Sequence, residues 1–218
     1  LYQLHWPDRP MRLFGGLGYQ HSEGETHAIE NILGTLGELV SEGKVRYVGL
    51  SNETPWGTMR FLQASETLGL PRVQSIQNAY NLLNRTFEFG GSEIAHREQV
   101  GLLGYSPLAQ GYLSGKYQNG ALPEGSRKQL FNRLQRYETP PAAATIDKYL
   151  AIAAKYGLDP SQMANQFVTT RPFVTSNIIG ATSLQQLELA LTSVDVPWSE
   201  DLEKDIEAVH LSQPNPCP

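Results

Sequence analysis

The sequence contains a single cysteine, Cys217, close to its carboxyl end. No disulfide can therefore form within the chain, which is typical of proteins from a reducing compartment such as the cytoplasm. Also lacking are any apolar run approaching the ~18–20 residues that span a membrane and a signal peptide ahead of Leu1. These absences predict a cytoplasmic protein with no membrane partner.

Basic residues are fewer than acidic ones, with 17 Lys and Arg against 22 Asp and Glu and a formal net charge of −5. A protein that binds the phosphate backbone normally carries a basic patch, so nucleic acid is not an expected partner. The histidines are scattered, with no cysteine or pair of carboxylates near them at ligand spacing, and no metal site is predicted.

Short apolar segments alternate with helical patterns along the 218 residues, a length that can bury one domain core. The expected strands cover 1–5, 45–52, 73–78, 101–106 and 176–181. The expected helices cover 26–43, 54–69, 88–99, 143–156, 160–171 and a last segment from 199, with a Gly- and Pro-rich loop over 107–128. This alternation is typical of an α/β protein with a parallel sheet.

Individual residues predict where two of these helices start and which side chains they bury. Thr54-Pro55 and Asp159-Pro160 each combine a cap residue with a proline at the first helical position. Apolar residues at helical spacing predict the buried faces of three helices. They are Ile29, Ile32, Leu33, Leu36 and Val40 in the first helix, Phe61, Leu62 and Leu68 in the second, and Leu202, Ile206 and Val209 in the last.

Two architectures fit this order, an open doubly wound sheet and a (β/α)₈ barrel. A Gly-x-Gly-x-x-Gly turn after the first strand would favour the open sheet, and none is present there. Polar residues instead follow each strand, at the positions that form the active face of a barrel. Only five strands are found, however, whereas a closed barrel of this kind has about eight.

Five segments carry a resemblance to a known family: "LYQLHWP", "VRYVGLSNE", "SIQNAYNLLNR", "GYSPLAQGYLSGKY" and "IIGATSLQQLE". In this order they resemble the aldo-keto reductase superfamily, nearest to its branch of Tas-like reductases and potassium-channel β subunits. The resemblance runs over essentially all 218 residues. It implies a partial (β/α)₈ TIM barrel with strands four to eight, a long loop after strand seven and a C-terminal helix.

The same resemblance implies that 1–218 is a single aldo-keto reductase-type domain, truncated at its N-terminus. About three strand–helix units, at roughly 30 residues each, would be missing. The catalytic Asp, Tyr and Lys of the family would lie in that segment, and the chain alone is expected to be inactive. Whether another chain supplies the segment, and whether the protein forms homo-oligomers, the sequence leaves open.

The resemblance assigns His5 to catalysis, where it would hydrogen-bond the substrate carbonyl oxygen. Ser51, Asn52 and Gln77 would hold the nicotinamide carboxamide, a group whose C=O and NH₂ need both donors and acceptors. Simpler readings remain: His5 as a plug in a barrel mouth, and Ser51-Asn52 as the start of a turn.

The resemblance also assigns cofactor contacts to the fourth expected strand and the loop after it. Tyr105, followed by Ser106 and Leu108, would stack on the nicotinamide ring. The alternative is an ordinary buried tyrosine at a strand end.

In the loop itself, Gly111 would permit close backbone approach to the pyrophosphate, as would Gly115. Lys116 would meet phosphate as a point charge, and Arg127 would fork onto the 2′-phosphate. The alternative is a flexible surface loop with two ordinary cations.

The last strand–helix junction carries three further cofactor-binding candidates, Gly180, Thr182 and Gln186. A helix N-terminus binds phosphate well, but Ser183-x-x-Gln186 also reads as a capping box that serves only the helix. Where the family has acidic and amide contacts to adenine, this sequence has Leu189 and Ala190, which puts adenine binding in doubt.

The leading hypothesis is an NADP-dependent oxidoreductase that reduces small aldehydes or ketones to alcohols. The alternative is an NADP-sensing, non-catalytic regulatory subunit like the channel β subunits. A third reading, an unrelated (β/α) enzyme with a phosphate site, is disfavoured by the Ser-Asn, Gln and Tyr set. The physiological substrate cannot be read from the sequence.

Overall fold

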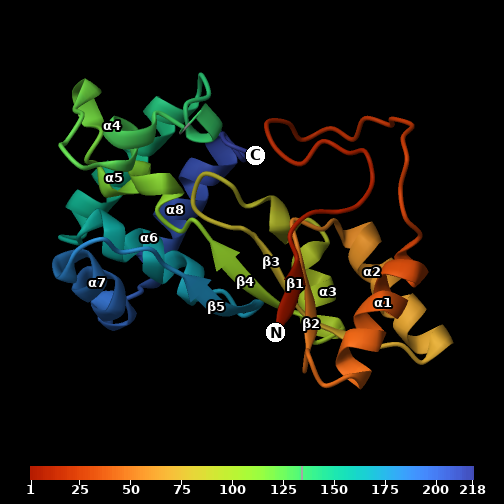
Figure 1. Ribbon diagram of the computed structural model, residues 1–218. Coiled ribbons are helices and arrows are strands. Elements are labelled where there is room, and N and C mark those ends of the chain that lie inside the picture. Colours follow the sequence, from red (N-terminus) through yellow and green to blue (C-terminus); the bar gives the residue numbers. More distant parts are fainter. Residues whose placement is uncertain (134) are drawn as a thin grey trace. The chain divides into compact units, whose positions relative to one another are not determined.

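A computed structural model describes residues 1–133 and 135–218 (Figure 1). The strands in these residues are β1 (Tyr2–Leu4), β2 (Val48–Ser51), β3 (Val73–Ala79), β4 (Gly101–Tyr105) and β5 (Val174–Ile178). They form one sheet in the order β1-β2-β3-β4-β5, and β2 pairs in parallel with both β1 and β3. The predicted α/β class with a parallel sheet is confirmed.

The strand order also decides between the two architectures. Each crossover advances one place in the same direction, whereas a doubly wound sheet reverses its order at a switch point. The sheet is therefore barrel-like rather than doubly wound. Its assignment to strands four to eight of a barrel stays a prediction.

Helices connect the strands and close the chain. The α-helices are α1 (Ile29–Ser41), α2 (Pro55–Leu68), α3 (Gly91–Arg97), α4 (Arg127–Phe131), α5 (Ala142–Lys155), α6 (Pro160–Thr169), α7 (Leu184–Leu191) and α8 (Glu200–Ser212). Short 3₁₀ turns are η1 (Thr86–Glu88), η2 (Ala109–Ser114), η3 (Gln118–Gly120), η4 (Gln135–Tyr137) and η5 (Thr192–Asp195). The predicted loop after β4 thus contains η2 and η3 and leads into α4. Within the described residues, no helix combines the length and apolar character needed to cross a membrane.

The chain divides into two compact units. The first comprises 1–78, 87–103 and 172–175, and the second comprises 79–86, 104–171 and 176–218. The predicted organisation as a single domain stays a prediction.

The predicted cap residues start α2 and α6 as expected. The Thr54 hydroxyl accepts a hydrogen bond from the Gly57 N–H at 3.2 Å, and Asp159 Oδ1 accepts from the N–H of Ser161 at 2.7 Å. A side-chain oxygen at this position satisfies a helix N–H that has no partner within the helix. Gly69 ends α2 with φ 64°, a left-handed conformation that glycine adopts without steric cost.

The core of the first unit lies between the sheet and its helices. Figure 1 shows α1 and α2 side by side next to β1 and β2. Leu33, Leu36, Phe61 and Leu62 are buried there, as their spacing predicted, and Leu50 of β2 is buried with them. The other predicted residues of the first helix are only partly buried: Ile29, Ile32 and Val40. Leu68 is 56% exposed, so its predicted contact is wrong; it is the last residue of α2, beyond the part of the helix that packs.

In the second unit, β5 and α8 differ from the expected pattern. β5 ends at Ile178, although the apolar run continues beyond it, so the predicted strand 176–181 was placed too late. On α8, Leu202 and Ile206 are buried as expected, but His210 rather than Val209 continues the buried face. The helix turn therefore places position 210 inward, four residues after Ile206.

An ion pair joins the end of α6 to α8 within the second unit. The Arg171 guanidinium donates to both carboxylate oxygens of Glu203 at 2.7 and 2.6 Å, and the Trp198 indole N–H donates to the same carboxylate at 2.5 Å. Arg171 also lies over the Phe167 ring, 4.6 Å from its centroid. The hydrogen bond from Arg171 lowers the pKa of Glu203, because it favours the ionised form.

Replacing Glu203 with Ala should lower the free energy of unfolding by about 1.5–3 kcal/mol, since Arg171 and Trp198 lose their shared charged acceptor. Urea denaturation followed by circular dichroism measures this. The matched control is Glu200→Ala on the same helix. Glu200 is 94% exposed, and its ion pair with Lys204 is weak because the two charged atoms are 3.9 Å apart. Equal effects of the two substitutions would contradict the proposed importance of the Glu203 cluster.

Candidate functional site

The carboxyl ends of β1, β2 and β3 are tied together by hydrogen bonds in the first unit. The Ser51 hydroxyl donates to the Gln77 carbonyl oxygen at 2.6 Å, and the Asn52 backbone N–H donates to the same oxygen at 3.0 Å. The Asn52 side-chain amide donates to the His5 carbonyl oxygen at 3.0 Å. The structure therefore brings together all four predicted site residues of this unit.

Asn52 adopts an unusual backbone conformation at this junction, with φ 53°. Asparagine tolerates the left-handed region better than most residues, because its short polar side chain can hydrogen-bond locally. Its side-chain amide also donates to the Ser51 hydroxyl at 3.2 Å. The Ser-Asn pair thus begins a turn, as the simpler reading proposed, and also connects two strand ends.

The Gln77 side chain has a partner that the sequence analysis missed. Its amide donates to Gln3 Oε1 at 3.0 Å, and the Gln3 amide donates to the Leu50 carbonyl oxygen at 3.3 Å. Gln3 lies two residues before His5, and residues two apart in a strand project from the same face. That period-two spacing was the signal that could have found Gln3.

The His5 side chain packs against aromatic residues. Its imidazole stacks on the Trp6 indole with ring centroids 4.4 Å apart and planes inclined by 20°. Phe14, from the loop after β1, meets the Trp6 ring edge-on at 5.7 Å. Trp6 therefore covers one face of the His5 ring, and Phe14 in turn contacts Trp6, contacts that sequence reasoning did not assign.

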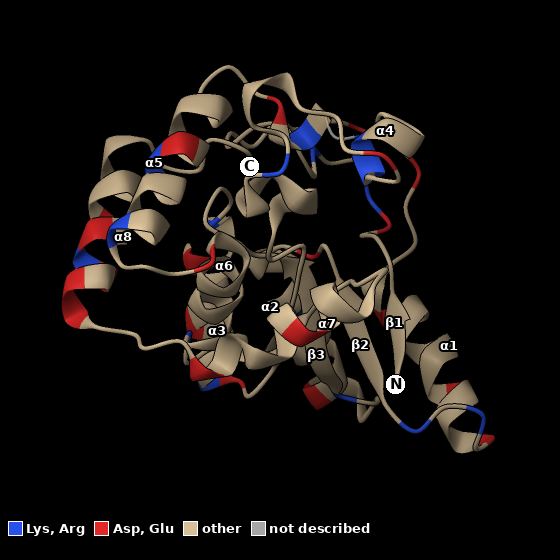
Figure 2. Cartoon of the chain, turned by 90° about the vertical axis from the view of Figure 1, so that its left-hand side faces the viewer, with Lys and Arg blue, Asp and Glu red and all other residues tan. Residues whose placement is uncertain are grey.

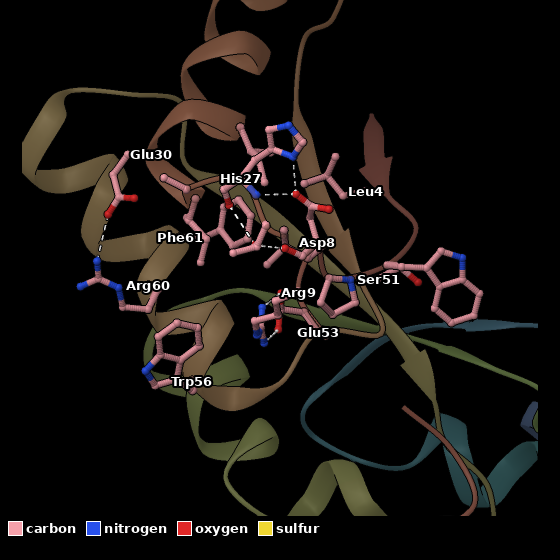
Figure 3. Close-up of a pocket in the computed structure, with 17 residues that line it drawn as sticks. Leu4, Asp8, Arg9, His27, Glu30, Ser51, Glu53, Trp56, Arg60 and Phe61 are labelled. Atoms are coloured by element: carbon pink, nitrogen blue, oxygen red, sulfur yellow. Dashed lines mark hydrogen bonds and ion pairs between the residues drawn. The ribbon is translucent and has the colours of Figure 1, made fainter. Parts of the chain in front are cut away.

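A pocket of about 400 Å³ lies in the first unit between α1, α2 and the loop after β1 (Figure 3). Ser51 and Trp6 are among its lining residues, together with apolar side chains such as Phe61. The pocket therefore borders one of the predicted carboxamide contacts.

The charged groups of this pocket have hydrogen-bonding or ion-pair partners within it. Arg9 pairs with Glu53 at 2.5 Å, His27 with Asp8 at 2.6 Å, and Arg60 with Glu30 at 2.9 Å. Glu53 is buried, and the N–H of His27 lowers the pKa of Asp8. Figure 3 shows these pairs around the pocket rim. The walls consequently suit a small, largely neutral molecule rather than a strongly charged one.

The second unit contains the predicted stacking residue Tyr105 and a strained backbone after it. Ser106 has φ 60°, Ala109 φ 47°, Gln110 φ 57° and Gly111 φ 102°. For a residue other than glycine, the left-handed region costs about 1–2 kcal/mol. Clusters of such residues are typical of functional sites, where the surrounding structure holds the strain.

Gln110 and Gly111 lie within this strained backbone. Gln110 Oε1 is buried and has no hydrogen-bond partner among the described residues. A Cβ on Gly111 would lie 2.6 Å from Cε of Lys116, a flexible side-chain end that could shift, and the φ of 102° independently favours glycine at this position. Gly111 does permit a close approach, here by Lys116 itself; an approach by phosphate stays a prediction.

The cations of this loop differ in their partners. Within residues 1–133 and 135–218, neither Lys116 nor Arg127 pairs with a carboxylate, although Lys116 lies over the Tyr117 ring. Lys128, by contrast, donates to Glu138 at 2.8 Å and to the Tyr112 hydroxyl at 3.0 Å. Figure 2 shows the basic residues of α4, where Arg127 and Lys128 are neighbours. Of these two neighbours, Lys128 has a carboxylate partner within the described residues and Arg127 has none.

The contact with Glu138 changes how both groups titrate. The hydrogen bond from Lys128 lowers the pKa of Glu138 below its usual 4.5, and the Glu138 carboxylate raises the pKa of Lys128. The Tyr112 hydroxyl also donates to Glu138, while burial raises the pKa of Tyr112. This cluster fastens residues at both ends of the loop to each other.

At the start of α7, the predicted phosphate contacts serve the helix in this structure. Ser183 Oγ accepts from the Gln186 N–H at 3.2 Å, and Gln186 Oε1 accepts from the Thr182 N–H at 2.9 Å. Ser183 therefore caps the helix as that reading proposed, whereas Gln186 bonds the residue before the cap instead of the cap itself. Cofactor contacts by Gly180, Thr182 and Gln186 stay predictions.

Among the residues that the structure describes, no group of three or more His, Cys, Asp or Glu side chains could hold a metal ion. The first unit instead gathers amides, a hydroxyl and an imidazole at the carboxyl ends of parallel strands. This arrangement defines a barrel-like α/β protein with a candidate small-molecule site at its strand ends.

Sequence comparison then identifies the family. Residues 1–210 match the model of the aldo/keto reductase family, and the chain belongs to that family, whose members are oxidoreductases. It is 45% identical to Protein tas of Escherichia coli strain K12 over 219 residues, covering 100% of this chain and 63% of that relative. It thus spans less than two thirds of the length of this relative.

Two further relatives support the same assignment. An aldo-keto reductase of Babesia bovis is 36% identical over 232 residues, covering 99% of this chain and 81% of the relative. The L-glyceraldehyde 3-phosphate reductase of Escherichia coli strain K12 is 32% identical over 176 residues, covering 78% and 50%.

The Glu138 cluster generates a pH-dependent prediction. Because its pKa is lowered on folding, ionised Glu138 stabilises the protein at pH values above 4.5, and this contribution is lost as the pH falls through the lower folded value. The wild-type chain should therefore lose more stability than Glu138→Gln below pH 4.5. Urea midpoints of both proteins between pH 3 and pH 7 measure the difference. Parallel pH profiles would contradict a stabilising role for the carboxylate.

Proposed function

We propose that the protein functions as an NADP-dependent reductase of small aldehydes or ketones. The observation that carries this proposal is the joining of His5, Ser51, Asn52 and Gln77 by hydrogen bonds at the ends of three parallel strands. Family membership supports an oxidoreductase, and the choice of NADP and of carbonyl substrates is our inference.

The amide and hydroxyl side chains fit the nicotinamide carboxamide. That group has one acceptor and one NH₂ donor, and Ser51, Asn52 and Gln77 offer both complements. A charged side chain would match it less well, because burial beside a neutral ligand disfavours an unpaired charge. The hydrogen bonds already present would hold these side chains in place before a ligand arrives.

Lys116 and Arg127 fit the phosphate end of the cofactor. Neither is paired with a carboxylate among the described residues, so neither would need to break an ion pair to meet a phosphate. The planar guanidinium of Arg127 suits the two-oxygen recognition of a 2′-phosphate, and Lys116 acts as a point charge. Gly111 and the neighbouring strained backbone would keep Lys116 in position.

When bound, the cofactor would supply a hydride. His5 would donate a hydrogen bond to the substrate carbonyl oxygen and so orient it. Trp6 would hold the imidazole by stacking, and Asn52 would fix the His5 backbone. The general acid of the family is expected outside the motifs found in this chain, so the whole protein rather than this segment is the proposed enzyme.

Replacing Arg127 with Ala should weaken NADPH binding roughly ten- to a hundredfold and leave NADH binding nearly unchanged, because only NADPH carries the 2′-phosphate. Isothermal titration calorimetry with both nucleotides measures this, and the NADPH affinity should also fall as salt is added.

Arg97→Ala is the matched control, because Arg97 lies on the exposed surface of α3 and, among the residues that the structure describes, pairs only with Glu93. Its affinity for both nucleotides should equal that of the wild type. Equal losses of NADPH and NADH affinity in Arg127→Ala would reject the assigned role of Arg127, and no NADPH binding by the wild-type chain would reject the proposed function.

A further inference from the structure

We propose that Asn81 is a positioning residue for the nicotinamide end of the cofactor, acting through the strained end of β4. The proposal rests on the proposed function, because it concerns Tyr105 and Ser106, which the family resemblance assigns to the nicotinamide end of the cofactor. Asn81 itself is fully buried and would touch no ligand.

The Asn81 side chain uses every hydrogen-bonding group it has. Its Oδ1 accepts from the N–H groups of Leu83 at 2.9 Å and Asn84 at 3.1 Å. Its NH₂ donates to the Ser106 carbonyl oxygen and to the Tyr137 hydroxyl, both at 3.0 Å. An uncharged amide is the side chain that offers two donors and an acceptor with two lone pairs in so small a volume.

The four hydrogen bonds of Asn81 have two different roles, one local and one between distant residues. The two bonds accepted by Oδ1 form a local turn over Asn81–Asn84 and would persist with any acceptor oxygen at that place. The two bonds donated by the NH₂ reach residues far along the chain, at Ser106 and Tyr137. Of the four bonds, only the one to Ser106 acts directly on a predicted cofactor residue, and the one to Tyr137 connects Asn81 to η4.

The bond to Ser106 falls where the backbone is strained. Ser106 has φ 60°, and the left-handed residues Ala109 and Gln110 follow shortly after. Such conformations persist only where the surrounding structure specifies them. The buried Asn81 amide stabilises this conformation by donating to the Ser106 carbonyl oxygen. Rotating the Ser106 peptide would leave an Asn81 N–H without an acceptor in the core.

The same network reaches the Tyr105 ring. The Tyr80 N–H donates to the Tyr105 carbonyl oxygen at 3.3 Å, and the Arg136 guanidinium donates to the Tyr105 hydroxyl at 3.4 Å. Arg136 and Tyr137 both belong to η4, at the far end of the cofactor loop. Burial raises the pKa of Tyr137, so its hydroxyl stays protonated, and a lone pair of its oxygen accepts the bond from Asn81. Asn81 thus connects Ser106, at the end of β4, to η4, whose Arg136 contacts the Tyr105 hydroxyl.

Asn81→Asp tests the proposal, because it keeps the acceptor oxygen of the turn and removes the two donated bonds. Affinities are measured by isothermal titration calorimetry for NADPH and for 2′-phospho-ADP-ribose, which carries the same phosphates but no nicotinamide. We expect NADPH to bind about tenfold more weakly to Asn81→Asp, the equivalent of about one lost hydrogen bond. Binding of 2′-phospho-ADP-ribose should stay within about twofold of the wild-type value.

Tyr137→Phe removes one acceptor from the same amide and keeps the ring in place. It should weaken NADPH binding in the same direction but by less, again without changing the affinity for 2′-phospho-ADP-ribose. This second variant decides the question if Asn81→Asp fails to fold. Asn31→Asp makes the same chemical change on the exposed face of α1 and should match the wild type with both ligands.

The outcomes are distinct. Selective loss of NADPH affinity supports the positioning role. Equal loss of both affinities shows that Asn81 only maintains the fold, and unchanged affinities show that the donated bonds do not matter; either result overturns the proposal. A wild-type chain that binds neither nucleotide rejects the proposed function, and the role of Asn81 with it.

Discussion

The Gln77 carbonyl oxygen, which accepts hydrogen bonds from the Ser51 hydroxyl and the Asn52 N–H, is the point on which the candidate site depends. Each bond contributes only about 0.5–1.5 kcal/mol to stability. Their effect is geometric: β1 and β2 have three and four residues, too few to fix the direction of the side chains that follow them. Asn52 extends the connection to His5, so one left-handed asparagine aligns three strand ends.

The second unit meets the same requirement by a different means. Ser106, Ala109, Gln110 and Gly111 are held in left-handed conformations that most residues avoid, and helices α5 and α6 pack against the turn η2 that contains three of them. Further contacts come from the buried Asn81 amide, which donates to the Ser106 carbonyl oxygen, and from the half-buried Lys116 stem, which lies beside Gly111. The Lys128–Glu138 pair then restrains the remainder of the loop. Strain at the proposed functional residues is thus balanced by ordinary hydrogen bonds a few residues away.

Features of the fold that depend on neighbouring residues could be predicted from the sequence. Thr54 and Asp159 cap their helices because the following N–H groups are within reach of one side chain, and the alternation of strands and helices gave the parallel sheet. Contacts between distant residues could not be predicted: Gln3 meets Gln77 across 74 positions, and Asn81 meets Tyr137 across 56. The ion pair of Lys128 with Glu138 could not be predicted either, because composition alone does not show which of several cations has a carboxylate partner. The early start of β5 shows that an apolar run does not by itself fix which residues pair.

The central proposal is that the predicted nicotinamide residues of the first unit and the predicted cofactor residues of the loop after β4 each contact NADPH. Hydrogen–deuterium exchange with mass spectrometry, with and without NADPH, tests it most directly. The account predicts slower exchange in peptides covering Ser51–Thr54, Gln77–Asn81 and Tyr105–Arg127, with no change in peptides at the opposite strand ends, around Arg46 and Arg72. Protection confined to those opposite ends, or no protection anywhere at saturating NADPH, would contradict it.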